Sequence, residues 1–253
     1  LKSKEDSIAF INEFRLFEDV SRERTIHESY ANQDFIISRV IPKCRAGKIE
    51  PLVLLNTQRY VEFVKGTFGV RTRAYISLKK LPSNSSLAEI LKAKRNKKES
   101  FSESQVLAIL INLAKFIKLC HEEGIGGFNL RPDNIFLEKG IPMLFDVSGL
   151  KRFKEEKENP KLVYFENSGV ETGYTRPSEE CTIRQIDYFS LGMLGLAIST
   201  AEAKFAYFNS AVQERLHDYK SKFVNLFEIL ENLLNETPAS RADLDSILNQ
   251  TII

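Results

Sequence analysis

The side chains of this sequence that could do chemistry gather between Cys120 and Leu150, in the stretch CHEEGIGGFNLRPDNIFLEKGIPMLFDVSGL. Asp146 offers a carboxylate, which is a hard-oxygen ligand of the kind that Mg²⁺ accepts. Asn129 offers an amide, which carries no charge and cannot serve as a general base. These residue types fit a site that holds a metal or a nucleotide better than a site that moves protons.

The elements expected around this stretch are a long helix and two short strands. Ser102-Glu103-Ser104-Gln105 is a capping box that predicts the start of the helix, and Gly124 predicts its end. Apolar residues recur at helical spacing and predict one buried face: Val106, Ile109, Leu110, Leu113, Ile117 and Cys120. After a loop, we expect a strand, a turn, a second strand and a loop that begins at Asp146.

The first third of the chain is predicted to be rich in β-structure. Residues 1–18 suit a short helix that runs into a first strand. The run Phe35–Lys43 is dominated by β-branched residues, as strands prefer. After Pro51 we expect a short helix, LVLLNTQ, since proline is acceptable at a helix start. Two further strands are expected at Tyr60–Lys65 and Arg73–Lys79, joined by a turn that contains glycine.

The rest of the chain is predicted to be mostly helical. Ser86 is available as the cap of a short helix, Ser86–Lys94, and residues 151–180 are expected to form a long loop. Asp187–Ser199 predicts a buried helix because it is very apolar. Three more helices are expected near the end of the chain: Ala203–Ala211, Lys220–Leu234 and Arg241–Asn249. A β-rich first third followed by helices predicts an α+β fold, in two lobes.

The composition argues against several classes of protein. With 253 residues, 43% of them hydrophobic and 28% charged, the chain is globular, and its net charge of +2 argues against a dedicated nucleic-acid binder. Apolar stretches such as Leu191–Ala201 fall short of the roughly 18–20 residues of a membrane span, and the start of the chain lacks an apolar signal core. Cys44, Cys120 and Cys181 lie far apart, which predicts reduced thiols in a cytoplasmic or nuclear protein.

Two segments resemble motifs of protein kinases. Asn129-Leu130-Arg131-Pro132-Asp133-Asn134 resembles the catalytic loop H-R-D-L-x-x-x-N, and Asp146-Val147-Ser148 resembles the D-F-G that follows it. The resemblance is strong over residues 101–253 and thin over 19–100. It implies a single protein-kinase-like domain over the whole chain, with a small β-rich N-lobe at about 1–80, a hinge at about 78–86 and a larger, mainly helical C-lobe at about 87–253.

Several positions depart from the kinase pattern at the residues that carry catalysis. Asn129 stands where the family has its catalytic Asp, and loss of a general base typically costs about 10²–10⁴ in rate. Phe128 replaces the Arg that anchors a phosphorylated activation loop, and Ser148 replaces the Gly of D-F-G. The Gly-rich loop that covers the phosphates would fall at Ser21–Ile26, yet the first glycine of the chain is Gly47.

Other positions keep residue types that a nucleotide site would need. Asn134 and Asp146 match the two metal ligands, although Asn134 could instead fix the loop backbone and Asp146 could cap a turn. Arg131 replaces a Lys that faces the γ-phosphate. Lys43 ends the segment VIPK, which resembles V-A-I-K, so it is the candidate for the phosphate-gripping Lys, with Glu50 as its partner. The alternative for Lys43 is an exposed lysine at the end of a strand.

The remaining matches concern the scaffold of the fold. Glu179 closes a segment that resembles A-P-E, and we expect it to form an ion pair with Arg241, with Glu180 as the fallback. Asp187, in IDYFSLG, matches the Asp that holds the backbone of the catalytic loop. These positions specify a fold and say nothing about turnover.

Matches in the scaffold and departures at the catalytic positions together favour a pseudokinase. Such a domain has no catalytic activity, requires no cofactor, and acts as a protein-binding scaffold or an allosteric regulator. Two alternatives stay open: a divergent ATP-binding kinase with weak Ser/Thr phosphotransfer, and weak binding of ATP and Mg²⁺ without catalysis. The expected partners are proteins, with no nucleic acid and no membrane span. Candidate surfaces are the loop 151–176, the extension 1–18 and the basic run 92–98, whose alternative is a solvated loop tip.

Overall fold

Helices and small antiparallel sheets make up the part of the chain that the structure describes, so the fold is α+β. The computed structural model describes residues 35–47, 56–66, 69–78, 86–144, 150–153, 161–162, 181–202 and short runs between 214 and 249. Most of the predicted hinge lies outside these ranges, and the arrangement in two lobes therefore stays a prediction.

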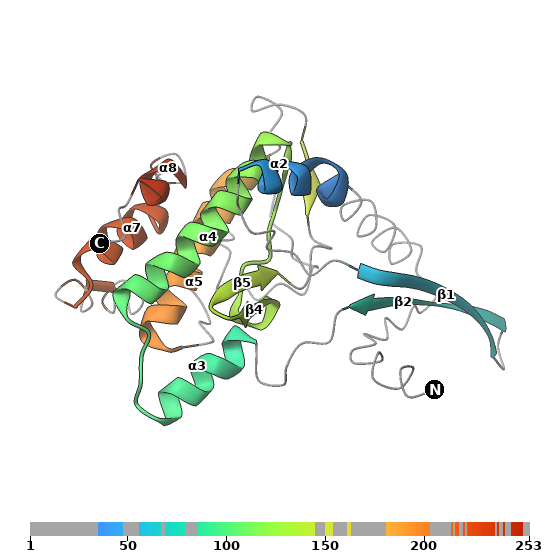
Figure 1. The fold of residues 1–253 in the computed structure, drawn as a ribbon, viewed down its shortest axis with the longest axis horizontal. Helices are drawn as coiled ribbons and strands as arrows, with labels where there is room; N and C mark the ends of the chain where they lie inside the picture. The colour runs from blue at the N-terminus through green and yellow to red at the C-terminus, as the bar shows by residue number, and fades with distance from the viewer. Residues whose placement is uncertain are drawn as a thin grey trace.

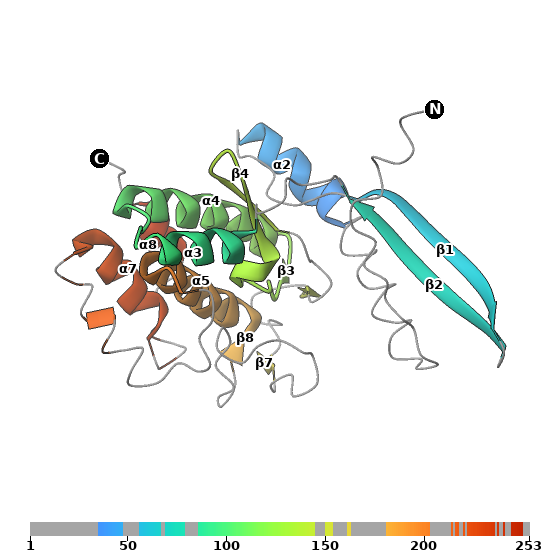
Figure 2. The same cartoon turned by 90° about the horizontal axis from the view of Figure 1, so that it is seen from below.

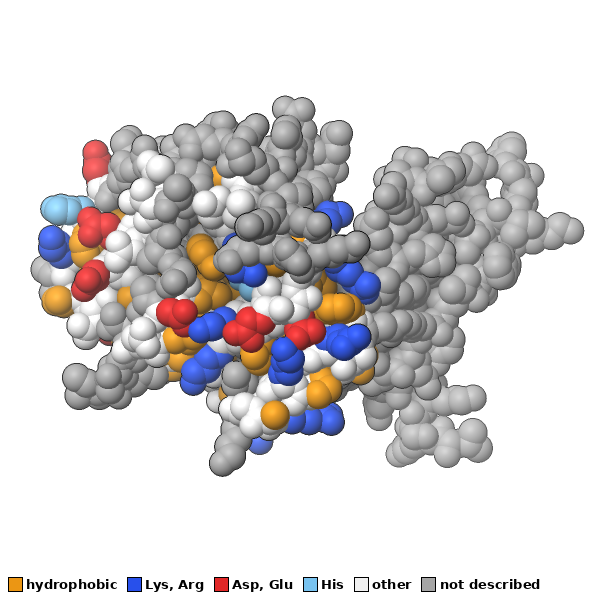
Figure 3. Space-filling model, turned by 90° about the horizontal axis from the view of Figure 1, so that it is seen from above, with side chains coloured by type: hydrophobic (Ala, Val, Ile, Leu, Met, Phe, Trp, Pro, Cys, Tyr) orange, Lys and Arg blue, Asp and Glu red, His pale blue; other side chains and the backbone are white. Residues whose placement is uncertain are grey.

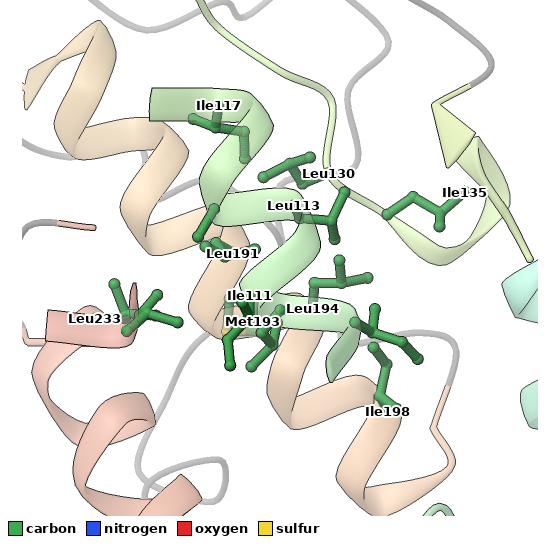
Figure 4. Close-up of a cluster of buried hydrophobic side chains, with 14 of the residues drawn as sticks. Ile111, Leu113, Ile117, Leu130, Ile135, Leu191, Met193, Leu194, Ile198 and Leu233 are labelled. Atoms are coloured by element: carbon green, nitrogen blue, oxygen red, sulfur yellow. The ribbon is translucent and has the colours of Figure 1, made fainter. Parts of the chain in front are cut away.

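A group of packed helices forms the centre of the molecule. It contains α4 (Glu103–Glu122), α5 (Ile183–Thr200), α7 (Val224–Leu233) and α8 (Leu244–Leu248). In this group α4 packs against α5 and α8, and α5 packs against α7 (Figure 1). The hydrophobic core lies between these helices, and Figure 4 shows Leu113 and Ile117 of α4 facing side chains of α5 and of the loop that follows α4.

The predicted capping box opens α4. The hydroxyl of Ser102 accepts a hydrogen bond from the Gln105 backbone N–H at 3.3 Å, and the Gln105 side chain accepts one from the Ser102 N–H at 3.0 Å. Gly124, with φ of +71°, follows the end of the helix as predicted. All six apolar residues of the predicted face are buried. Local sequence signals were sufficient for this helix.

Helix α5 begins earlier than the sequence suggested. Thr182 and Gln185 form a second capping box, which starts the helix at Ile183 instead of Asp187. Every residue of α5 from Phe189 to Ser199 is buried, as its apolar sequence predicted. A Cβ at Gly195 would lie 2.6 Å from Leu230 of α7, so the glycine allows the two helices to approach closely.

The segment Phe35–Lys43 is helical, and the prediction of a strand there is wrong. A π-helical segment, η1 (Ile36–Val40), continues into α2 (Ile41–Ala46). Ile36, Val40 and Cys44 are spaced four residues apart and are fully buried, so they form one helical face. Burial of this face against the core outweighs the strand preference of the β-branched residues. Pro42 lies in the first turn of α2, where a missing N–H costs little.

The two strands predicted around the glycine turn form an antiparallel hairpin, which confirms the prediction. The strands are β1 (Asn56–Gly66) and β2 (Gly69–Leu78), with Gly66 opposite Gly69 and Tyr60 opposite Tyr75. Residues 56–58 are part of β1, so the helix expected after Pro51 does not extend that far; residues 51–55 lie outside the described part. In Figures 1 and 2 the hairpin extends away from the helices.

The remaining elements are short. Helix α3 (Leu87–Asn96) begins at Ser86, whose hydroxyl accepts a hydrogen bond from the Glu89 N–H at 3.3 Å, as predicted. The other elements are β3 (Ile125–Gly126), η2 (Pro132–Asn134), β4 (Ile135–Glu138), β5 (Ile141–Leu144), β6 (Lys151–Arg152), β7 (Lys161–Leu162) and β8 (Cys181–Thr182). Strand β3 pairs with β6, β4 with β5, and β7 with β8. Helices α7 and α8 occupy the two last predicted segments with shorter bounds, and the helices predicted at 1–18 and 203–211 lie outside the described residues.

Among the residues that the structure describes, α4 is one helix with the length and apolar content of a membrane span. Inside the fold, 61% of that apolar window is buried. A buried core helix has the same composition, so α4 is weak evidence for a span.

Candidate functional site

The candidate site is the segment 127–134, here called the Asn129 loop. It leaves β3 and enters β4 through η2. Leu130 and Ile135 are buried, at 1% and 0% exposure, and Figure 4 shows Leu130 beside Ile117 of α4. Because these apolar side chains lie in the core, the polar residues between them occupy defined positions at its edge.

Asp187 holds the first part of the Asn129 loop from helix α5. The carboxylate is fully buried and accepts hydrogen bonds from the backbone N–H of Gly127 at 2.9 Å and of Phe128 at 2.7 Å. This is the contact that the kinase resemblance implies for Asp187. Nε2 of His121, at the end of α4, lies 2.7 Å from the same carboxylate. A buried carboxylate is costly unless its oxygens are satisfied, and these three partners satisfy it.

Gly126 and Gly127 allow the backbone to run close to Asp187. A Cβ at Gly126 would lie 2.7 Å from Ile183 and 2.9 Å from Oδ2 of Asp187. Gly127 has φ of +86°, a conformation that residues with side chains rarely adopt. Glycine therefore suits this position of the loop.

Phe128 is part of the core. Its ring is 3% exposed, lies 6.1 Å from the Phe116 ring in an edge-to-face arrangement, and lies 6.4 Å from the His121 ring. The position that carries an Arg in the resembled motif is thus occupied by an apolar ring packed between helix α4 and the anchor. No cationic group reaches outward from this position.

The second part of the loop is held by its own backbone. The carbonyl oxygen of Asn129 accepts hydrogen bonds from the side-chain amide of Asn134 and from the N–H of Arg131, each at 3.0 Å. Asn134 is buried, at 4% exposure, and its N–H donates to the Arg131 carbonyl at 2.9 Å. Asn134 therefore fixes the loop backbone, as one of its two predicted roles requires. Its side-chain nitrogen donates to the Asn129 carbonyl oxygen.

A metal would have to be held by Asn134 and Asp146 together. The amide oxygen of Asn134 is a suitable ligand type, and its nitrogen already points to the loop backbone. Asp146 lies outside the described residues. A site formed by Asn134 and Asp146 together therefore stays a prediction. Within the described part of the chain, no cluster of three or more His, Cys, Asp or Glu side chains could hold a metal ion.

Arg131, within the Asn129 loop, has part of its guanidinium group unsatisfied. Its Nε is buried and has no hydrogen-bond partner among the described residues. A buried donor without an acceptor costs stability, so an acceptor at this point would be favourable.

Lys43 does not lie on a strand, as the predicted phosphate-gripping Lys would. In kinases this Lys lies on a strand, whereas Lys43 lies on helix α2, and the prediction based on VIPK is wrong in that respect. Its ammonium group forms an ion pair with Glu123, just after α4. The hydrogen bond that Lys43 donates to the Glu123 carboxylate raises the pKa of Lys43 above its ordinary value. Glu50, the predicted partner, lies outside the described residues.

Other predicted positions lie where the structure gives no description. These are Ser21–Ile26, Ser148, Glu179, Glu180 and Arg241. The predicted ion pair between Glu179 and Arg241 and the degraded phosphate loop stay predictions.

Sequence reasoning missed two side chains that support the loop. His121 lies four residues after Ile117 on the buried face of α4, so a polar residue on an apolar stripe was the signal that it needed a partner. Arg184 donates a hydrogen bond to the His121 carbonyl at 3.2 Å and lies over the Phe153 ring, 5.4 Å from its centroid. Phe153 N–H in turn donates to the Gly124 carbonyl at 2.7 Å. These contacts of Arg184 and Phe153 hold the segment 150–153 against the end of α4.

The three cysteines are free thiols within the fold. Cys44, Cys120 and Cys181 are all buried, in agreement with the predicted reduced state. Burial raises the pKa of the Cys120 thiol well above its ordinary value, and it raises the pKa of Cys44 as well. A raised pKa favours the protonated thiol, so Cys44 and Cys120 are poor nucleophiles.

Comparison with known proteins gives a limited similarity to a kinase. No known family profile matches the chain. Over 119 residues the chain is 28% identical to a Wee1-like protein kinase of Arabidopsis thaliana. The match covers 46% of this chain and 20% of the relative, so it spans about a fifth of that protein's length. The chain is thus similar to part of a protein kinase, in agreement with the resemblance of its motifs.

Proposed function

We propose that this chain is a pseudokinase, a protein-kinase-like domain that does not transfer phosphoryl groups and acts as a protein-binding scaffold or allosteric regulator. The similarity to a kinase and the contact between Asp187 and the loop backbone support the kinase-like part of the proposal. A location in the cytoplasm or nucleus agrees with three free thiols and stays a prediction.

The observation that carries the proposal is the residue at position 129. The loop backbone around Asn129 is held on both sides, by Asp187 before it and by Asn134 after it. An amide at this position cannot accept the proton of a substrate hydroxyl, and the usual cost of losing a general base is about 10²–10⁴ in rate. Phe128 beside it lies in the core and cannot bind the phosphate of an activation loop.

A second candidate function is weak binding of ATP and Mg²⁺, without catalysis or with slight Ser/Thr phosphotransfer. The buried Nε of Arg131, which lacks a partner among the described residues, supports this candidate because a phosphate oxygen would satisfy it. Asn134 and Asp146 are the residues that would hold the metal.

Thermal unfolding with millimolar ATP and Mg²⁺ tests nucleotide binding. A ligand at about 100 times its Kd should stabilise the fold by roughly 2.7 kcal/mol, whereas the scaffold proposal predicts no shift. A double variant, Asn134→Ala with Asp146→Ala, is the control, because a shift that it retains would come from another site.

A phosphotransfer assay with labelled ATP tests catalysis directly. We expect no transfer from the wild type to itself or to a generic protein substrate. Transfer that the wild type shows and the Asn134→Ala, Asp146→Ala variant lacks would overturn the proposal. Transfer that persists in the double variant would be a contaminant. An Asn129→Asp variant measured in parallel shows whether the missing carboxylate is the main defect.

A further inference from the structure

The C-terminal half of α3 and the turn after it carry five basic residues within seven positions. The α3 basic end comprises Lys92, Lys94, Arg95, Lys97 and Lys98. All but Lys94 are exposed, and the side chain of Arg95 is 67% exposed. In Figure 1 this end of α3 lies at the edge of the molecule, away from the hairpin.

Nearby acidic residues do not neutralise this surface. Lys94 lies 3.9 Å from Glu99 and lies over the Phe101 ring, and Arg95 lies 3.9 Å from Glu202. Ion pairs with one exposed partner and a separation near 4 Å contribute little. Lys92, Lys97 and Lys98 form no ion pair with any residue that the structure describes. A net positive charge therefore remains on this end of the helix.

Compensation of the helix dipole explains only part of the surface. Cations in the last turn of a helix are favourable, which accounts for Lys94 and Arg95. Lys97 and Lys98 follow the helix end. Lys98 has φ of +57°, in the left-handed region where Gly or Asn is the ordinary choice. A glycine at position 98 would remove the backbone strain of this conformation, whereas Lys98 adds positive charge.

The surroundings of the α3 basic end favour an acidic protein segment over nucleic acid. Proteins that bind single strands usually combine basic grooves with exposed aromatic rings. The large hydrophobic side chains that are exposed in the described chain are Ile37 and Val224, neither of them aromatic, and Phe101 next to the patch is 7% exposed. The sequence pI of about 8.3 is also below the range typical of nucleic-acid-binding domains.

A membrane surface fits the α3 basic end no better. A helix that lies in a membrane interface needs a free apolar face opposite its basic face. The apolar face of α3 is formed by Leu87 and Leu91, and both are fully buried in the protein. On the face shown in Figure 3, Lys and Arg side chains of the described residues lie among Asp and Glu side chains.

We propose that the α3 basic end is a docking surface for a short acidic segment of a partner protein, through contacts between carboxylates and the exposed cations Lys92, Arg95, Lys97 and Lys98. This inference rests on the proposed scaffold role and names the chemistry of its partner. Because the surface is exposed and electrostatic, binding should be fast, of modest affinity and weakened by salt.

Fluorescence anisotropy with a labelled peptide of alternating Glu and Ser tests the docking surface. We expect the wild-type chain to bind the peptide at low ionic strength. The triple variant Lys92→Glu, Lys97→Glu, Lys98→Glu should bind about tenfold more weakly or worse, because three attractive contacts become repulsive. All three side chains are exposed, so the variant should keep the circular dichroism and unfolding midpoint of the wild type.

A matched control changes the net charge equally at another place. Arg39→Glu, Arg45→Glu and Lys139→Glu alter exposed residues outside α3, and this variant should bind the peptide as the wild type does. Equal loss of binding in both triple variants would overturn the proposal, because the attraction would then depend on total charge. Absence of binding by the wild type would overturn it too.

Two further probes test the class of partner. A single-stranded oligonucleotide or an anionic phospholipid vesicle that binds more tightly than the peptide, and loses binding in the α3 variant, would overturn the assignment to a protein partner. Phosphoryl transfer by the wild type would remove the proposed scaffold function and leave the peptide result unaffected. Failure of the peptide test would remove the docking surface alone, so the two failures are distinguishable.

Discussion

Among the polar contacts that join other parts of the chain to the end of α4, two differ sharply in their surroundings. Asp187 of α5 is fully buried and binds two backbone N–H groups and His121. Lys43 of α2 pairs with Glu123, with side chains 48% and 18% exposed. One contact lies in the core with every partner fixed, and the other lies at the surface in water.

The difference shows which part of the molecule determines the position of the Asn129 loop. In the core, removal of one partner leaves donors without acceptors, and this cost is large. At the surface, water replaces the lost partner at little cost. We therefore expect the loop to depend on α5 and to be nearly independent of the ion pair with α2. The following substitutions test this comparison, beginning with the largest effect.

Replacement of Asp187 by Ala should cause the greatest loss of stability. Two buried N–H groups and His121 lose their acceptor, and the expected cost is about 3–5 kcal/mol of unfolding free energy. Urea denaturation followed by circular dichroism measures it. Asp245→Ala is the matched control, since Asp245 is 53% exposed and pairs with Lys118 at the surface, and it should cost less than about 1 kcal/mol. If Asp187→Ala and Asp245→Ala lower the unfolding free energy equally, burial of the Asp187 contacts does not make them more important than a surface ion pair.

A comparison of Gly124→Ala with Gly140→Ala should show a smaller loss of stability, caused by the close contact at Gly124. Both glycines have positive φ, at +71° and +84°, so Ala at either position should cost about 1–2 kcal/mol of backbone strain. A Cβ at Gly124 would also collide with the Phe153 carbonyl oxygen, whereas at Gly140 nothing lies within 4 Å. Gly124→Ala should therefore destabilise the fold by at least about 1 kcal/mol more than Gly140→Ala. If thermal unfolding finds the two variants alike, the contact between the α4 end and Phe153 is not tight.

The smallest effect is expected for Lys43→Met. Because the pKa of Lys43 is raised by Glu123, the contribution of the pair is fully present near neutral pH and is lost as the pH rises through that raised value. Urea denaturation should show a slight difference from the wild type at neutral pH that disappears in strongly alkaline solution. Arg45→Met, which removes an exposed cation from the same helix, is the control. A large effect of Lys43→Met would contradict the comparison and assign α2 a part in holding the loop.

Local signals predicted much of the helical part. The capping box at Ser102 and the glycine at 124 correctly marked the ends of α4, since caps and periodicity depend on neighbours in the chain. The hairpin around Gly66 and Gly69 was found for the same reason. The role of Asp187 came from a resemblance of motifs, because nothing in its local sequence indicates a partner 59–60 residues away.

The segment 36–46 shows where local signals failed. Its β-branched residues favour a strand, yet Ile36, Val40 and Cys44 become one buried helical face. The VIPK segment resembles a strand motif of kinases, and the same error therefore placed Lys43 at a phosphate site. Propensities of this size are outweighed when a helix face can be buried against a core, and the sequence does not show where that core lies.

The sequence by itself determined the α+β class, the limits of α4, the hairpin, and the absence of a carboxylate at Asn129. Each of these depends on residue identity or on neighbours along the chain. Only the tertiary structure decided that α2 is a helix, that Lys43 pairs with Glu123, and that His121 joins Asp187 beneath the Asn129 loop. Such contacts join residues far apart in sequence, and in the core they form because burial leaves polar groups no other partners.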